Sequence, residues 1–118
     1  MNTLYYLPSC DTCKKIIKSL PNIDKLIFRD IKKDPITEQE LDRMYTLSTS
    51  YESLFSRKAQ LYKSLDLKNK ILTEADYKKY MLEHYTFLSR PVFIIEDNIF
   101  IGNNSNTIAI VLNRMKNL

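Results

Sequence analysis

Two cysteines separated by two residues, Cys10 and Cys13, lie near the start of the chain in the segment LYYLPSCDTCKK. They are the only cysteines in the sequence, so any cysteine chemistry depends on this pair. A Cys-x-x-Cys pair is compatible with a metal site, a permanent structural disulfide or a dithiol that is reversibly oxidised. The surrounding sequence must decide which of these it is.

A metal site needs more ligands than the sequence offers near this pair. Zinc sites take four ligands, as two cysteine pairs or as cysteines with histidines, and the single histidine, His84, is distant in sequence. A permanent disulfide across so short a loop would contribute little through loop-closure entropy. Two merely buried cysteines fit less well, since Pro8 and Ser9 before the pair favour exposure. We therefore expect no metal and a redox-active dithiol.

The segments on either side of the pair predict how it is held. Residues 3–7 form an apolar strand that Pro8 ends. Apolar residues then recur at helical spacing, and the helix is expected to stop before Pro21; these residues are Cys13, Ile16, Ile17 and Leu20. Residues 25–31 predict a second strand, which completes a βαβ unit.

This placement puts Cys10 at the mouth of a helix and Cys13 one turn further on. Unpaired backbone N–H groups and the helix dipole favour an anion at that position, so the pKa of Cys10 is expected to be lowered. The thiolate is the reactive form of cysteine. Cys13 is then close enough to attack a mixed disulfide formed on Cys10.

The middle of the chain predicts helices. Thr37 with Glu40, and later Thr73 with Asp76, have the spacing of a capping box at a helix start. Residues 51–65 predict one or two short helices between them.

The last quarter of the chain predicts a hairpin and a final helix. Residues 92–95 form a strand, the dipeptide 97–98 can make a tight turn, and residues 99–101 return as a strand. Asn104 or Ser105 would then cap the last helix. The expected order is βαβ, a helical insert, α and ββα.

Composition excludes several classes of function. A chain of 118 residues that is 44% hydrophobic and 27% charged fits one globular domain. Neither a membrane span nor a signal-peptide layout is recognisable, so we expect a cytoplasmic protein. The net charge of +4, from 18 basic and 14 acidic residues, is spread along the chain, so direct nucleic-acid binding is not expected. The single glycine, Gly102, excludes Gly-rich phosphate loops.

Together these features resemble the thioredoxin fold and, more narrowly, the ArsC/Spx family of glutaredoxin-like proteins with a helical insertion. The resemblance covers essentially the whole chain. It is carried by CDTCKK at the cysteine pair, SRK at 56–58, LSRPVFI at 88–94 and the helical segment LTEADYKKYMLEH before it. It implies one α/β domain over residues 1–118 with a thioredoxin-like mixed sheet and an insert at approximately 36–72.

The resemblance also implies which residues form the site. Cys10 matches the cysteine with which arsenate reductases of this family attack the oxyanion, and Cys13 would be the resolving thiol. Arg57 and Arg90 match two arginines that bind the anion, next to a cis Pro91. Guanidinium groups suit tetrahedral oxyanions, and the helix N-terminus, with the backbone N–H of Thr12, adds further donors.

One departure concerns a third arginine, which the arsenate reductases carry after the next hairpin and which Gly102-Asn103-Asn104 replaces here. The resemblance implies no bound cofactor, and electrons would come from glutathione, glutaredoxin or thioredoxin. We expect a monomer that acts as an arsenate reductase-like thiol–disulfide oxidoreductase.

An alternative is an Spx-like redox-sensing regulator that binds RNA polymerase and uses the disulfide as a switch. Spx-like proteins carry the second cysteine, as this chain does. They also carry a glycine in the insert, which the matching residues 47–55 lack. The oxidoreductase is therefore the preferred interpretation.

Overall fold

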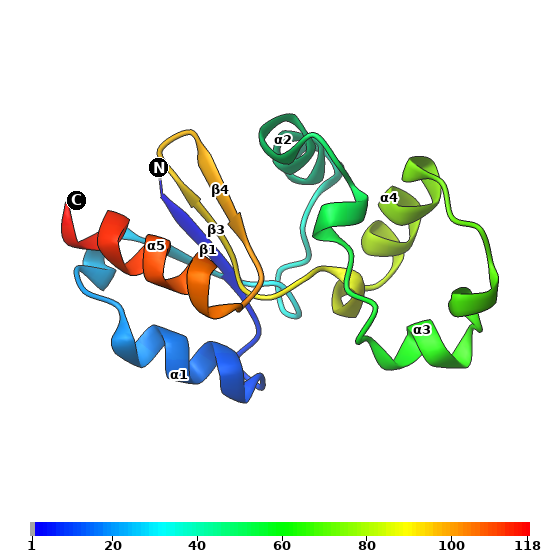
Figure 1. The fold of residues 1–118 in the computed structure, drawn as a ribbon, viewed down its shortest axis with the longest axis horizontal. Helices are drawn as coiled ribbons and strands as arrows, with labels where there is room; N and C mark the ends of the chain where they lie inside the picture. The colour runs from blue at the N-terminus through cyan, green and yellow to red at the C-terminus, as the bar shows by residue number, and fades with distance from the viewer. Residues whose placement is uncertain (1) are drawn as a thin grey trace. The chain divides into compact units, whose positions relative to one another are not determined.

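The computed structural model describes residues 2–118, which form two compact units (Figure 1). The first unit combines the residues up to Asp34 with Arg90–Leu118, and the second is Pro35–Ser89. The insert predicted at 36–72 lies within the second unit, which also contains α4 (Glu74–Glu83). None of the helices in the described part of the chain is both long and apolar enough to cross a membrane.

The first unit is built on a mixed four-stranded sheet. Its strands are β1 (Thr3–Tyr6), β2 (Ile27–Asp30), β3 (Val92–Ile95) and β4 (Asn98–Ile101). They lie in the order β2-β1-β3-β4, with β1 parallel to β2 and β3 antiparallel to both β1 and β4. The predicted mixed α/β sheet is confirmed. β3 is central and buried along its whole length, which explains its unbroken apolar sequence.

Two helices, α1 (Asp11–Ser19) and α5 (Ser105–Lys116), lie on the same side of this sheet (Figure 1). The buried side chains that join them to it are Leu4, Ile16, Leu20, Leu26, Phe93, Ile95, Val111 and Met115. Burial of each large apolar side chain contributes about 1.5–3 kcal/mol. The apolar stripe of α1 therefore fixes this helix, and the residue at its start, against the sheet.

The hairpin between β3 and β4 turns one residue earlier than the sequence predicts. Its two connecting residues are Glu96 and Asp97, and Asn98 is already the first residue of β4. Glu96 takes a left-handed conformation with φ 57°. Its N–H donates to the side chain of Asn2 at 2.7 Å, and its carboxylate pairs with Arg114 of α5 at 2.9 Å. Contacts from both ends of the chain thus hold the turn, and local sequence does not reveal them.

The second unit consists of helices and short 3₁₀ segments. Its elements are α2 (Glu38–Ser48), η2 (Glu52–Leu54), α3 (Gln60–Ser64), η3 (Leu67–Asn69), α4 and η4 (Tyr85–Phe87). Both predicted capping boxes are present, Thr37 with Glu40 before α2 and Thr73 with Asp76 before α4. The sequence did not predict η3 and η4, nor η1 (Ile23–Lys25) in the first unit.

Aromatic rings fill the interior of the second unit around Phe55. The Phe55 ring stacks on Phe87, with centroids 5.1 Å apart, and lies 4.9 Å from the ring of Tyr77. Backbone bonds from Ser56 to Phe87 and from Ser89 to Leu54, at 2.7 and 2.8 Å, tie the two segments together. The segment that carries Arg57 is therefore anchored on its N-terminal side by packing within its own unit.

Candidate active site

Cys10 stands at the N-cap of α1, as the sequence predicts. The chain leaves β1 through Leu7, turns at Pro8 and Ser9, and the Cys10 N–H donates back to the Leu7 carbonyl at 3.1 Å. The Cys10 backbone is extended, with φ −84° and ψ 114°, and its carbonyl accepts the first helical bond from Lys14 at 3.0 Å. Local turn geometry therefore places this sulfur beside the unpaired N–H groups of the first helical turn.

The two cysteines share this turn but have different surroundings. Both are free thiols. Cys10 is partly exposed, whereas Cys13 is 1% exposed and faces the core under α1. An external molecule can therefore approach Cys10, while Cys13 is shielded from it.

The surroundings of Cys10 favour its thiolate. Burial alone would raise the pKa of this thiol, but interactions with Cys13, the backbone N–H of Thr12 and the charge of Arg90 outweigh it, so the pKa lies below its ordinary value. As a neutral thiol, Cys10 makes no side-chain capping bond to α1. The N–H groups of Thr12 and Cys13 are nonetheless near enough to stabilise the sulfur once it is charged.

The surroundings of Cys13 favour its protonated form. Burial, with smaller contributions from the hydrogen bond to Cys10 and from the negative charge on that sulfur, raises the pKa of Cys13 to about 11. The Leu7 backbone and Arg90 act in the opposite direction without reversing the result. At neutral pH, Cys13 therefore keeps its proton, which it can share with the Cys10 sulfur.

Arg90 and Pro91 form the third part of this site in the first unit. The Arg90–Pro91 peptide bond is cis, as the family resemblance implies. The charge of Arg90 acts on both sulfurs and lowers the pKa of each. The structure thus brings Cys10, Cys13, Arg90 and the Thr12 backbone together.

The loop after β4 supports Arg90 and Pro91 from behind. The Gly102 N–H donates to the Pro91 carbonyl at 2.9 Å, and the Asn103 side chain donates to the Arg90 carbonyl at 3.4 Å. Gly102 has φ +85°, a conformation that favours glycine. Sequence reasoning considered this loop for the arginine that it lacks and for a cap of the last helix, and did not foresee these contacts with Arg90 and Pro91.

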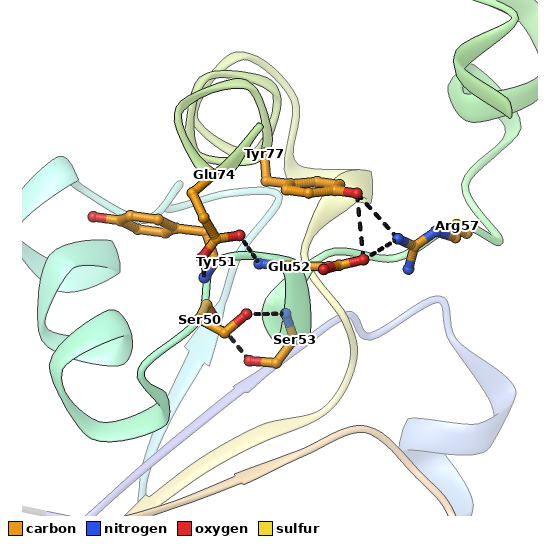
Figure 2. A network of polar contacts seen from close by, with 7 residues as sticks. All are labelled: Ser50, Tyr51, Glu52, Ser53, Arg57, Glu74 and Tyr77. Carbon is orange, nitrogen blue, oxygen red and sulfur yellow. Dashed lines mark hydrogen bonds and ion pairs between the residues drawn. The ribbon is translucent and has the colours of Figure 1, made fainter. Parts of the chain in front are cut away.

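Arg57 belongs to the second unit and has its partners there (Figure 2). Its Nη2 atom donates to the Glu52 carboxylate at 2.6 Å and to the Tyr77 hydroxyl at 3.1 Å. The bond to Glu52 is the main reason why the pKa of Arg57 is raised above its ordinary value. The sequence had no signal for this network, because Glu52 and Arg57 are five positions apart, which matches neither helical nor strand spacing. A role for Arg57 beside Cys10 remains a prediction.

Comparisons with known proteins agree on the family. The ArsC family model matches residues 5–111. The chain is similar to the global transcriptional regulator Spx 1 of Bacillus cereus, with 28% identity over 116 residues that cover 97% of this chain and 88% of the relative. It is also similar to an arsenate reductase of Haemophilus influenzae, with 27% identity over 120 residues that cover 92% of this chain and 97% of the relative.

Solved structures support the fold. The structure of an ArsC family related protein from Bacteroides fragilis superposes with a TM-score of 0.79 at 23% identity, over 93% of this chain and 96% of that one. The predicted thioredoxin-like fold is thereby confirmed.

Proposed function

Since this chain belongs to the ArsC family, we propose that it is a cytoplasmic thiol–disulfide oxidoreductase of the arsenate reductase-like type. Cys10 is the nucleophile and Cys13 the resolving thiol. The observation that carries this proposal is the division of roles within one helical turn: Cys10 is accessible with a lowered pKa, and Cys13 is buried with a pKa of about 11. Such a pair combines a thiol that ionises more readily than a free cysteine with a second, protonated thiol that can act after it.

The first step is attack by the Cys10 thiolate on one sulfur of a substrate disulfide. A bond forms between Cys10 Sγ and that sulfur while the substrate S–S bond breaks, and the second substrate thiolate leaves and takes a proton from water. Cys13 then loses its proton and attacks Cys10 Sγ, which releases the first substrate half as a thiolate. Two electrons have passed from the pair to the substrate, and the pair is left as a disulfide.

The high pKa of Cys13 does not prevent this second step. Two of the influences that raise it are the charge of the Cys10 thiolate and the hydrogen bond to that sulfur. Once Cys10 is held in a mixed disulfide it carries no charge, so both influences weaken and the pKa of Cys13 falls. Formation of the mixed disulfide thus prepares the thiol that resolves it.

No bound cofactor is needed in this proposal. Two molecules of glutathione, or one dithiol protein such as glutaredoxin or thioredoxin, reduce the pair again and are themselves oxidised to a disulfide. The protein acts as a monomer.

A substrate anion would bind beside Cys10 at the N–H groups near Thr12, at Arg90 and at the Pro91 loop. Arg57 enters this proposal from the family resemblance, because its contacts in the structure are with Glu52 and Tyr77. The third arginine of the arsenate reductases is absent from the Gly102-Asn103-Asn104 loop. We therefore expect disulfides to be better substrates than arsenate.

A second candidate is an Spx-like regulator that binds RNA polymerase and senses oxidation through the same pair. The similarity to Spx 1 of Bacillus cereus over 97% of this chain favours it. In that case the disulfide would change a binding surface, and turnover of a substrate would not be required.

A panel of three substrates separates these functions. Reduction of arsenate, of a glutathione mixed disulfide and of insulin is measured with glutathione plus glutaredoxin, and separately with thioredoxin, as electron donor. We expect turnover of at least one disulfide substrate that Cys10→Ser abolishes. Absence of turnover with every donor, together with oxidation-dependent capture of RNA polymerase, would replace the oxidoreductase with the regulator.

A further inference from the structure

The guanidinium group of Arg57 is already occupied at the nitrogen that bidentate binding requires. Both two-point edges of an arginine, Nη1 with Nη2 and Nε with Nη2, include Nη2. That nitrogen has two protons, and in this structure they have two acceptors, Glu52 Oε2 at 2.6 Å and the Tyr77 hydroxyl at 3.1 Å (Figure 2). Among the described residues, Nε and Nη1 have no such partner. Arg57 can therefore donate single hydrogen bonds to a further anion. It cannot offer the fork, that is, two parallel hydrogen bonds from neighbouring nitrogens.

Both partners of Arg57 are held in place by α4. Tyr77 is a residue of this helix, is 7% exposed, and packs its ring against Phe55. The Glu74 carboxylate, from the first turn of α4, accepts hydrogen bonds from the backbone N–H groups of Tyr51 and Glu52 at 2.7 and 3.0 Å (Figure 2). The segment that presents Glu52 is thus fixed to the same helix as Tyr77.

Charge reinforces this occupancy. The Glu52 carboxylate balances the single positive charge of Arg57. An approaching dianion therefore meets an ion pair with no net charge, and the carboxylate of that pair repels it. A tetrahedral dianion such as arsenate or phosphate normally gains from both the full charge and the bidentate geometry of arginine. A neutral disulfide bond needs neither.

We propose that Glu52 determines the substrate class by occupying the fork of Arg57, so that tetrahedral dianions are disfavoured and disulfides are accepted. The effect on catalysis depends on the proposed function, because it requires Arg57 to bind the substrate anion. The occupancy itself is a property of the second unit alone.

Phosphate protection of Arg57 tests the occupancy without turnover. Arg57 is modified with phenylglyoxal, the modified peptide is quantified by mass spectrometry, and inorganic phosphate is added as the protecting dianion. In Glu52→Ala, one Nη2 proton loses its acceptor and the positive charge of Arg57 is no longer balanced by a carboxylate. Phosphate should then bind Arg57 more tightly, so the phosphate concentration that gives half-maximal protection should fall by roughly five- to tenfold. The accompanying kcat/KM for arsenate should rise, while that for the glutathione mixed disulfide should change by less than about twofold.

Glu83→Ala is the matched control. Glu83 ends α4 in the same unit, its side chain is 56% exposed against 54% for Glu52, and its nearest cation, Lys79, is 4.0 Å away. It removes the same charge without touching Arg57. Glu52→Gln is a second variant in case Glu52→Ala alters the segment around η2. It keeps the side-chain length and removes only the charge, so we expect a smaller increase in phosphate protection in the same direction.

Equal phosphate protection in Glu52→Ala and Glu83→Ala would overturn the inference. That result would leave the proposed function intact, since disulfide reduction through Cys10 does not depend on it. Loss of the proposed function would appear differently, as absence of disulfide turnover with every electron donor or as disulfide reduction that survives Cys10→Ser.

Discussion

Cys10 and Cys13 lie on one turn of α1 with pKa values displaced in opposite directions, lowered for the partly exposed thiol and raised to about 11 for the buried one. The interaction between them contributes to both displacements, because the Cys13 side chain stabilises the charge on Cys10 and that charge disfavours a second charge on Cys13. The two thiols are therefore a coupled pair. Their asymmetry leads to several measurable consequences.

Oxidation should join the two cysteines reversibly. They are one helical turn apart, within the distance that a disulfide can bridge. Mass spectrometry of diamide-treated protein should show the loss of two hydrogens, and dithiothreitol should restore them. Cys13→Ser should instead give a mixed disulfide with added glutathione, located on Cys10. A protein that stays fully reduced in diamide would contradict the proposed mechanism.

Alkylation should reveal the lowered pKa of Cys10 and its dependence on Arg90. The rate of iodoacetamide labelling at Cys10 should rise through a transition below pH 9, the ordinary value for a cysteine thiol. Arg90→Ala removes a cation that favours the thiolate, so the transition should move upward by roughly half to one pH unit. Lys18→Ala, in the last turn of α1, is the matched control and should leave the transition in place. If the alkylation transition shifted equally in both variants, the shift would come from the change in net charge and not from the position of Arg90.

The raised pKa of Cys13 should make the reduced protein less stable in alkali. Between pH 9 and 11 the unfolded chain releases the Cys13 proton while the folded protein retains it, so the free energy of unfolding falls as the pH rises. The total loss is at most about 2–3 kcal/mol. Cys10 has a lowered pKa, so its contribution to stability rises with pH, levels off above the ordinary value of 9, and does not account for a loss at higher pH.

Urea unfolding at a series of pH values measures this loss. The difference in unfolding free energy between the reduced protein and Cys13→Ala should shrink between pH 9 and 11. A constant difference across that range would show that Cys13 ionises equally in both states.

Arginine at position 103 should improve arsenate reduction. Asn103 occupies the loop where arsenate reductases carry their third arginine, and its side chain is exposed beside Arg90. A charge-assisted bond to the oxyanion should raise kcat/KM for arsenate by roughly ten- to a hundredfold. Steady-state kinetics of Asn103→Arg against Asn103→Gln would separate the added charge from the lost contact with the Arg90 carbonyl. Equal arsenate activity in the two variants would place the oxyanion elsewhere.

The neighbouring residue is a poorer place for that arginine. Asn104 caps α5, and its side chain accepts the Thr107 N–H at 2.8 Å. Removal of such a cap costs about 1 kcal/mol. The sequence predicted either Asn104 or Ser105 as this cap, and the structure assigns it to Asn104.

Features that depend on neighbours in sequence were predictable. The apolar runs of β1 and β3, the helical period after Cys13 and the two capping boxes each follow from a few adjacent residues. The position of Cys10 at a helix start belongs to this group, because Pro8 ends the strand just before it.

Features that depend on partners distant in sequence were not predictable. Glu96 turns the hairpin because Asn2 and Arg114 hold it. Glu52 is positioned by Glu74, which lies 22 residues further on. In both cases a tertiary contact overrides the local preference of the chain, and a single sequence gives no sign of which residues will meet.

The placement of β1 at the centre of the sheet has a consequence for the newly made protein. β1 and the cysteine pair are synthesised before β3, so β1 can acquire its antiparallel neighbour only when Val92–Ile95 has been made. Arg90, which favours the Cys10 thiolate, arrives with that strand. Pairing across such a separation in sequence forms late in folding. Until that strand has been synthesised, the Cys10 thiol therefore lacks the contribution of Arg90 to its lowered pKa.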